Sequence, residues 1–279
     1  LLYLTYHNGD PYDASFSQRS FDDVDVYGAS ATVDWDFSPE VSLRSISAYR
    51  GFDRSTAIDL DGSPFQILDF NVMETTDNQW SQELQLLGSN FDNRWNWILG
   101  LFYSEESGTE YLQQTSIGAI SFQDAKVDNE STGVFGQGTF SFTEQLSLTA
   151  GVRYSVDDRS VTSANRNLTT CLALGQLLTA GPCHRVTSDT FDAVSYTLGL
   201  EYRPTSDLLV YVKTNRGYRS GLIPLTGGAT TPAAANTYWT PVNPEIVTDY
   251  EIGIKADWFD RRFRSNIAAF YTNYDDIQR

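Results

Sequence analysis

The chain has 279 residues, of which 36 are acidic and 19 basic, so its formal net charge is -17. Because phosphate contacts require clustered Lys and Arg, this charge argues against a nucleic-acid-binding surface. Aromatic residues make up 14% of the chain, which favours strands over helices, and no run approaches the roughly 20 apolar residues of a membrane-spanning helix.

Apolar and polar residues alternate along the chain with a period of two, as in a strand with two different faces. The longest example alternates Tyr27, Ala29, Ala31, Val33, Trp35 and Phe37 with Val26, Gly28, Ser30, Thr32, Asp34 and Asp36. The same pattern returns at residues 80–86, 95–103, 146–154, 196–202 and 250–258. One face suits hydrocarbon and the other suits water, which predicts strands that cross a membrane around a polar lumen.

The connections between these strands alternate in length. We expect tight turns at residues 38–40, 90–94, 143–145, 204–206 and 260–261. We expect long loops at residues 57–77, 113–128, 161–189 and 222–244. Short turns on one side and long loops on the other are typical of outer-membrane barrels. Including a short strand at residues 1–6, the pattern predicts about eleven strands of an all-β, antiparallel, up-and-down transmembrane β-barrel.

Two cysteines, Cys171 and Cys183, lie twelve positions apart in a predicted loop. We expect them to form a disulfide, which implies an oxidising compartment. Two free thiols are the alternative. A zinc site is the weaker alternative, because only His184 lies beside them and a structural zinc site needs four ligands.

Catalytic motifs are not found. The chain has two histidines, His7 and His184, and it lacks a nucleophile elbow, a phosphate-binding loop and a zinc-protease motif. We therefore expect neither an enzyme nor a cofactor. Residues 59–62 resemble the opening of a calcium loop, but the ligand positions that should follow are not filled, so a turn is predicted there and no metal site.

The C-terminal region resembles TonB-dependent receptors. The resemblance rests on Pro244-Glu245, on Tyr250-Glu251-Ile252-Gly253-Ile254-Lys255, on Phe259-Asp260-Arg261-Arg262 and on Phe270-Tyr271-Thr272-Asn273-Tyr274. Upstream, Gly217-Tyr218-Arg219-Ser220-Gly221 resembles the end of the preceding strand in the family. The likeness extends over nearly all of the chain.

The resemblance implies that residues 1–279 are part of a barrel of about 22 strands, without the family's N-terminal plug domain and without the last strands. It implies active uptake of a scarce nutrient across the outer membrane of a Gram-negative bacterium. The expected partners are outer-membrane lipid, the TonB complex acting through a plug, and a metal-siderophore complex. Vitamin, haem, saccharide and plant-derived aromatic ligands remain open. A passive porin-like channel and a soluble β-sheet binding module are the alternatives.

Ligand binding is expected in the long loops and the upper lumen. Aromatic and Arg side chains near a loop mouth stack on or pair with an anionic ligand, and packing in the girdle, a turn or the lumen is the alternative for each of them. The candidates are Tyr111, Arg216, Tyr218, Arg219, Tyr238 and Trp239.

Overall fold

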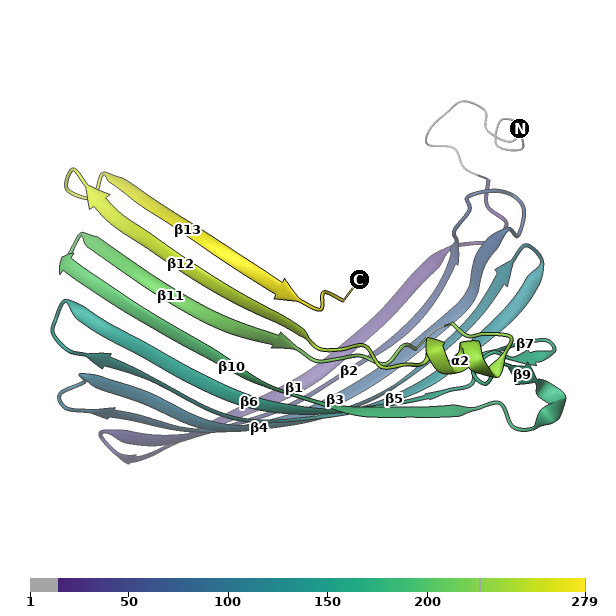
Figure 1. Cartoon of the computed structure of the whole chain (residues 1–279), viewed down its shortest axis with the longest axis horizontal. Coiled ribbons are helices and arrows are strands. Elements are labelled where there is room, and N and C mark those ends of the chain that lie inside the picture. The colour runs from purple at the N-terminus through teal and green to yellow at the C-terminus, as the bar shows by residue number, and fades with distance from the viewer. Residues whose placement is uncertain (1–14, 226, 279) are drawn as a thin grey trace.

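The computed structural model describes residues 15–225 and 227–278, and most of them belong to one antiparallel sheet (Figure 1). Ten long strands pair in sequence order within this described part. They are β1 (Phe21–Ser38), β2 (Val41–Asp59), β3 (Leu68–Asn90), β4 (Trp95–Ser116), β5 (Ala119–Ser141), β6 (Leu146–Ser163), β10 (Arg185–Thr205), β11 (Leu208–Arg219), β12 (Glu245–Trp258) and β13 (Phe263–Asp275). The predicted all-β, up-and-down antiparallel fold is confirmed, and the strand expected at residues 1–6 lies outside the described residues.

Small elements fill the longest connections. The segment between β6 and β10 contains β7 (Arg166–Asn167), β8 (Thr170–Cys171), β9 (Gln176–Leu177) and the short 3-10 helix η1 (Leu178–Ala180). The segment between β11 and β12 contains the helix α2 (Pro232–Tyr238). Within the described residues, no helix is both long and apolar enough to cross a membrane.

The sheet curves into an open trough whose two ends differ (Figure 1). At one end, called here the tight-turn end, residues 39–40, 91–94, 142–145, 206–207 and 259–262 connect successive strands. At the opposite end, called here the loop end, α2, β7 and β9 lie together. The edge strands β1 and β13 are not paired with each other in the described sheet, which is therefore the wall of a partial barrel.

The outer face of this wall is apolar and exposed. In register across three neighbouring strands, Leu86 lies opposite both Leu43 and Leu99. Leu99 is 54% exposed and Ile252 is 58% exposed, fractions that the core of a water-soluble sheet does not show. Hydrocarbon is the solvent in which such a face is stable, because it leaves no apolar surface in water.

Two rows of aromatic residues bound this apolar face. Near the tight-turn end, the rings of Trp95 and Phe140 lie 6.0 Å apart. Toward the loop end, the rings of Trp80 and Tyr103 lie 5.8 Å apart. On β4 the two rows lie at the two ends of residues 95–103. This length is close to the roughly 9 to 11 residues that a tilted strand needs to cross the hydrocarbon layer. Residues of β4 after Tyr103 therefore extend beyond the lipid.

Two of the tight turns have the same backbone and local sequences that differ at one position, Asn93 against Arg261. Phe91, Asp92 and Asn93 all have positive φ angles of 56 to 64°, and Phe259, Asp260 and Arg261 have angles of 54 to 65°. In each turn the Arg that follows donates its backbone N–H to the carbonyl of the Phe, at 3.2 Å. The turn expected at residues 260–261 thus spans residues 259–262, one residue more on either side. The other turn, at residues 91–94, lies within the range 90–94 expected from the sequence.

The prediction of a long loop at residues 113–128 is wrong. Strand β4 continues to Ser116, β5 begins at Ala119, and Ile117 and Gly118 form the turn with φ angles of 48° and 76°. The loop expected at residues 57–77 is likewise shorter, because β2 and β3 leave only residues 60–67 between them. Beyond the lipid both faces of a hairpin meet water, so apolar alternation stops although the backbone ladder continues.

Candidate ligand-binding site

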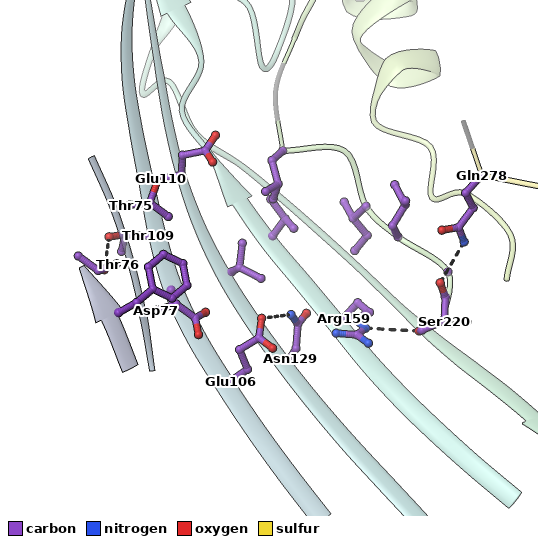
Figure 2. A pocket seen from close by; sticks show the side chains of 18 of the residues that line it. Thr75, Thr76, Asp77, Glu106, Thr109, Glu110, Asn129, Arg159, Ser220 and Gln278 are labelled. Carbon is purple, nitrogen blue, oxygen red and sulfur yellow. Dashed lines mark hydrogen bonds between the residues drawn. The ribbon is translucent and has the colours of Figure 1, made fainter. Parts of the chain in front are cut away.

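The inner face of the wall contains a cavity of about 420 Å³ near the loop end (Figure 2). Its inward-facing residues come from several strands because the alternation stays in phase across the sheet: Asp77 lies opposite Gly108, Gly108 opposite Val127, and Val127 opposite Val161. Five charged residues of the described chain line the cavity together with the amide of Asn129: Asp77, Glu106, Glu110, Arg159 and Arg219. All of them lie beyond the second aromatic row and outside the lipid-facing band.

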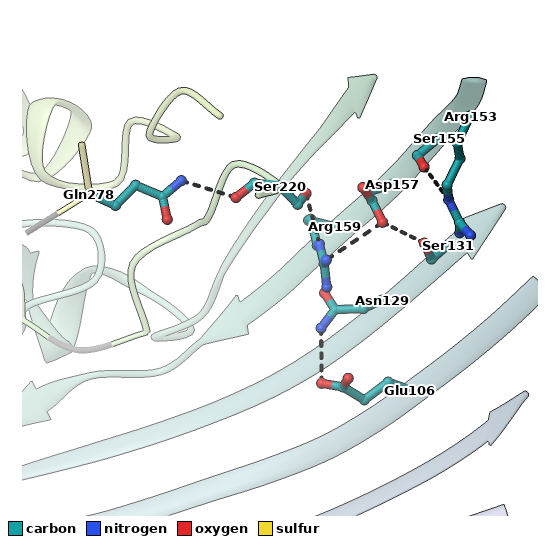
Figure 3. A network of polar contacts seen from close by, with 9 residues as sticks. All are labelled: Glu106, Asn129, Ser131, Arg153, Ser155, Asp157, Arg159, Ser220 and Gln278. Carbon is teal, nitrogen blue, oxygen red and sulfur yellow. Dashed lines mark hydrogen bonds and ion pairs between the residues drawn. The ribbon is translucent and has the colours of Figure 1, made fainter. Parts of the chain in front are cut away.

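A network of polar contacts fixes the far wall of the cavity (Figure 3). Arg159 contacts two groups: its Nε donates to Ser220 Oγ at 3.4 Å, and its Nη2 lies 3.7 Å from Asp157 Oδ1. Ser131 Oγ donates to the same Asp157 oxygen at 2.6 Å. These contacts tie β5 and β6 to the segment that follows β11.

A separate hydrogen bond lies beside this network: Asn129 Nδ2 donates to Glu106 Oε1 at 3.2 Å and joins β5 to β4. The network itself continues past Ser220. Gln278 Nε2 donates to the backbone oxygen of Ser220 at 3.0 Å, which adds the residues after β13. The curvature of the sheet therefore brings together side chains that are far apart in the sequence, and Arg159 is held between Asp157 and Ser220.

The cavity combines acidic and basic groups, and two of the acids are perturbed. Burial raises the pKa of Asp77 above its ordinary value, with a further rise from the charge of Glu106 that Arg50 partly offsets. Burial also raises the pKa of Glu110. When these two carboxyls take up protons, the net charge of the cavity becomes more positive, because Glu106 is then the one remaining acid, among the described residues that line it, opposite Arg159 and Arg219.

Of the residues predicted to bind ligand, the structure places Arg219 in the cavity wall. Its guanidinium is exposed and lies 3.9 Å from Glu245 Oε2. Tyr218 next to it has a buried hydroxyl, and burial raises the pKa of Tyr218 to about 12. Arg216 shares the outer face of β11 with Val212, and its Nη1 donates to the backbone oxygen of Val194 at 3.1 Å.

The other three candidates lie apart from the cavity. Tyr111 occupies an odd position of β4, on the same outward face as Leu101 and Tyr103. Tyr238 is the last residue of α2 and is half exposed. Trp239 is 1% exposed and packs against Ala235, Ala173 and Cys171. Tyr238 and Trp239 are thus parts of a small packed unit at the loop end.

The two cysteines belong to that unit. Cys171 and Cys183 form a disulfide with their Cα atoms 5.4 Å apart. Cys171 is fully buried beside Trp239, and the backbone N–H of Ala229 donates to the carbonyl of Leu172 at 3.0 Å. The disulfide therefore braces the loop between β6 and β10 at the place where α2 and its flanking segment pack on it.

Sequence reasoning missed most of the cavity. Asp77 is the last residue of the segment expected as a long loop at 57–77, and Glu106, Glu110 and Arg159 lie beyond the predicted strand segments 95–103 and 146–154. A signal was present: Glu106 and Glu110 keep the even, inward phase of β4 that begins with Asn96 in the lipid-crossing part. Extending the alternation past Tyr103 would have placed both carboxylates inside.

A separate group of three carboxylates lies where β2 and β3 are joined. One oxygen each from Asp59, Asp61 and Asp69 lies within 4.8 Å of the others. Asp59 and Asp61 belong to residues 59–62, which resemble the opening of a calcium loop. In the sequence, the ligand positions that should follow them are not filled. The structure supplies the third carboxylate from the opposite strand, so this group has the donor set of a metal site.

Three solved structures resemble this chain. The ferric yersiniabactin uptake receptor FyuA from Yersinia pestis superposes with a TM-score of 0.74 at 20% identity, covering 95% of this chain and 38% of that one. The siderophore receptor PiuA from Acinetobacter baumannii gives 0.67 at 15% identity, covering 92% and 41%. The ferric-catecholate import receptor Fiu from E. coli K12 gives 0.67 at 14% identity, covering 94% and 42%.

At these identities the three structures establish a shared fold. This chain spans about two fifths of the length of each of them, in keeping with a sheet that is open at β1 and β13. The family and these neighbours are receptors and transporters rather than enzymes. Residues 2–279 match the sequence model of the family described as "TonB dependent receptor-like, beta-barrel", and the chain belongs to that family.

Proposed function

We propose that this chain forms part of the barrel wall of a receptor in the outer membrane of a Gram-negative bacterium, and that the receptor actively takes up a ferric siderophore or a similar metal chelate. Family membership and the siderophore receptors among the similar structures support this proposal. The observation that carries it is the cavity on the inner wall, where Arg159 and Arg219 lie beyond the lipid band.

The chemistry of the cavity suits an anionic chelate. A guanidinium donates two parallel hydrogen bonds to paired oxygens, such as those of a carboxylate or a catecholate. Arg159 is positioned for this by Ser220 and Asp157, and Arg219 is exposed at the wall. Phe52 adds an apolar surface on the opposite side of the cavity, against which the organic part of a chelator packs.

Transport requires parts that lie outside residues 1–279 in this proposal. These residues are one portion of the barrel, a plug domain occupies the completed lumen, and the TonB complex of the inner membrane acts on the plug. Cells carrying the intact receptor should take up the chelate, and the uptake should be lost when TonB is removed. Uptake that persists without TonB would contradict the proposal and indicate a passive channel.

Replacing the two arginines should weaken ligand binding. We expect Arg159→Gln and Arg219→Gln each to raise the Kd of an anionic chelate by about tenfold to a hundredfold, since a hydrogen bond to a charged group contributes about 1.5 to 3 kcal/mol. Titration of the intact purified receptor with the ferric chelate measures the effect.

A matched control for Arg219→Gln is Arg203→Gln at the tight-turn end. Arg203 also forms an exposed ion pair, with Nη2 lying 2.8 Å from Glu201 Oε2. Its replacement should leave the Kd unchanged. If all three replacements raise the Kd equally, or if no replacement changes it, the two cavity arginines do not belong to the binding site.

Ligand affinity should depend on pH through Asp77 and Glu110. Their pKa values are raised above the ordinary 3.8 and 4.5, so both carboxyls lose their protons as the pH rises through these higher values. The cavity then becomes more negative, and the affinity for an anionic chelate should fall. In the double variant Asp77→Asn, Glu110→Gln the same chelate should show a flatter pH profile; identical profiles would contradict the assignment.

A further inference from the structure

The join between β2 and β3 places three acidic side chains together at the loop end of the wall. Asp59 ends β2, Asp69 lies at the start of β3, and the two residues are paired across the strands. Asp61 lies in the connection between them. Asp59 is 8% exposed and Asp69 is fully buried, so two of the three carboxylates have lost most of their contact with water.

Both carboxylate oxygens of Asp59 and both of Asp61 accept hydrogen bonds from backbone N–H groups. Asp59 Oδ1 accepts from the backbone N–H of Gly62 at 2.8 Å, and Asp59 Oδ2 accepts from the backbone N–H of Ser17 at 2.7 Å. Asp61 Oδ2 accepts from the backbone N–H of Leu68 at 2.8 Å, and Asp61 Oδ1 from that of Ser63 at 3.1 Å. These bonds hold the first two carboxylates in fixed orientations.

Asp69 differs from the other two. Its Oδ1 accepts from Ser17 Oγ at 2.8 Å, but its Oδ2 is buried and has no hydrogen-bond partner among residues 15–225 and 227–278. Leaving a buried carboxylate oxygen unsatisfied is costly, and the cost is greater beside two further negative groups. This oxygen is a direct indication that a partner with positive charge belongs in the group.

In the described part of the chain, the three carboxylates have no cationic side chain as a partner. Among the described residues, no Lys or Arg forms an ion pair with Asp59, Asp61 or Asp69. Residues 1–14 contain neither Lys nor Arg. A bound metal ion supplies a full positive charge to such a group.

We infer that Asp59, Asp61 and Asp69 bind a calcium ion that fastens the β2–β3 connection. Calcium takes oxygen ligands at about 2.3 to 2.6 Å, so two ligands of one ion lie at most about 5 Å apart. The three oxygens within 4.8 Å of one another meet that limit. Calcium fits better than magnesium because it tolerates the irregular arrangement that two strands and a loop impose, and water completes its shell.

The ion also connects the start of the wall to the join. Ser17 contacts both buried carboxylates, through its N–H and its hydroxyl, and lies just before β1. Calcium binding therefore orders residues 60–67 and holds the chain leading into β1 against β3. This inference concerns a different place from the cavity and does not rest on the proposed function.

Calcium binding is tested on the intact receptor, purified in detergent and freed of metal by dialysis against a chelator. Isothermal titration with calcium chloride should show one site fewer in Asp69→Asn and in Asp61→Asn than in the wild type. Asp23→Asn is the control, since Asp23 is an exposed carboxylate of β1 at the same end of the wall. Unchanged stoichiometry in both variants would overturn the inference.

A second measurement uses the unaltered protein, so that it does not depend on the folding of a variant. Calcium should slow backbone hydrogen exchange in residues 59–69 by tenfold or more relative to the metal-free receptor. If calcium has no effect there, or if magnesium alone protects equally, the calcium site is refuted. Protection in metal-free Asp69→Asn equal to that of the calcium-loaded wild type would also refute it, because Asp69 would then carry a proton.

Discussion

Replacing Leu99 by Arg should lower the free energy of unfolding of the intact receptor by about 2 to 4 kcal/mol, the cost of a cationic side chain at the midplane of a bilayer on the outside of a barrel. Leu99 lies midway between Trp95 and Tyr103 on β4, and its side chain is 54% exposed on the outer face. In the membrane that exposure is to hydrocarbon. Equilibrium unfolding in lipid vesicles, followed by the heat-dependent shift of the folded band, measures the loss.

The control is Gln85→Arg at the same depth on the other face. Gln85 lies opposite Gly100 in the β3–β4 register, so it occupies the level of Leu99 but points into the lumen beside Glu83. An added positive charge there meets water and an acidic neighbour, and stability should change little. Equal losses in the two variants would show that the outer face does not contact lipid.

Replacing Trp239 by Ala should release the packed unit at the loop end. Truncation of a fully buried Trp costs about 3 to 5 kcal/mol, and Trp239 is 1% exposed between α2 and the disulfide-bonded loop. Local opening that is easier by 3 kcal/mol speeds exchange of a protected amide about a hundredfold. The N–H of Ala229, which bonds to the carbonyl of Leu172, is the reporter.

The adjacent residue provides the comparison for this variant. Tyr238 is 47% exposed, so Tyr238→Ala should speed exchange at Ala229 far less than Trp239→Ala does. If both substitutions act alike, Trp239 is not the anchor of the unit. If Trp239→Ala instead leaves exchange unchanged but weakens ligand binding, the residue belongs to the ligand site, as its sequence context first suggested.

The strands could be predicted from the sequence wherever one face meets lipid. Along Trp95, Leu99 and Tyr103 the apolar alternation is enforced by the solvent on the outside, and the predicted strand is present. After Tyr103 this constraint disappears while the hydrogen-bond ladder continues to Ser116. The sequence there has the composition of a loop, which is why residues 113–128 were expected to form a loop and not the tip of the β4–β5 hairpin.

The candidate site was less accessible to sequence reasoning. Arg219 was found because it lies in a motif of the family strand ending. Its cavity neighbour Arg159 carries no local signal, since its position depends on the curvature that brings Ser220 to β6. The three-carboxylate group shows the same limit: Asp59 and Asp61 are close in sequence, but Asp69 joins them only through the β2–β3 register.

The β4–β5 hairpin has a consequence for what the outside of a cell presents. From Ser104 to Ser116 the strand adds roughly 40 Å of length at about 3.3 Å per residue. Its tip carries Ile117, an apolar side chain that is 85% exposed. If the loop end faces the outside of the cell, the tip of this hairpin lies farther out than the cavity residues Glu106 to Glu110, and an approaching antibody or virus particle contacts the tip before the cavity.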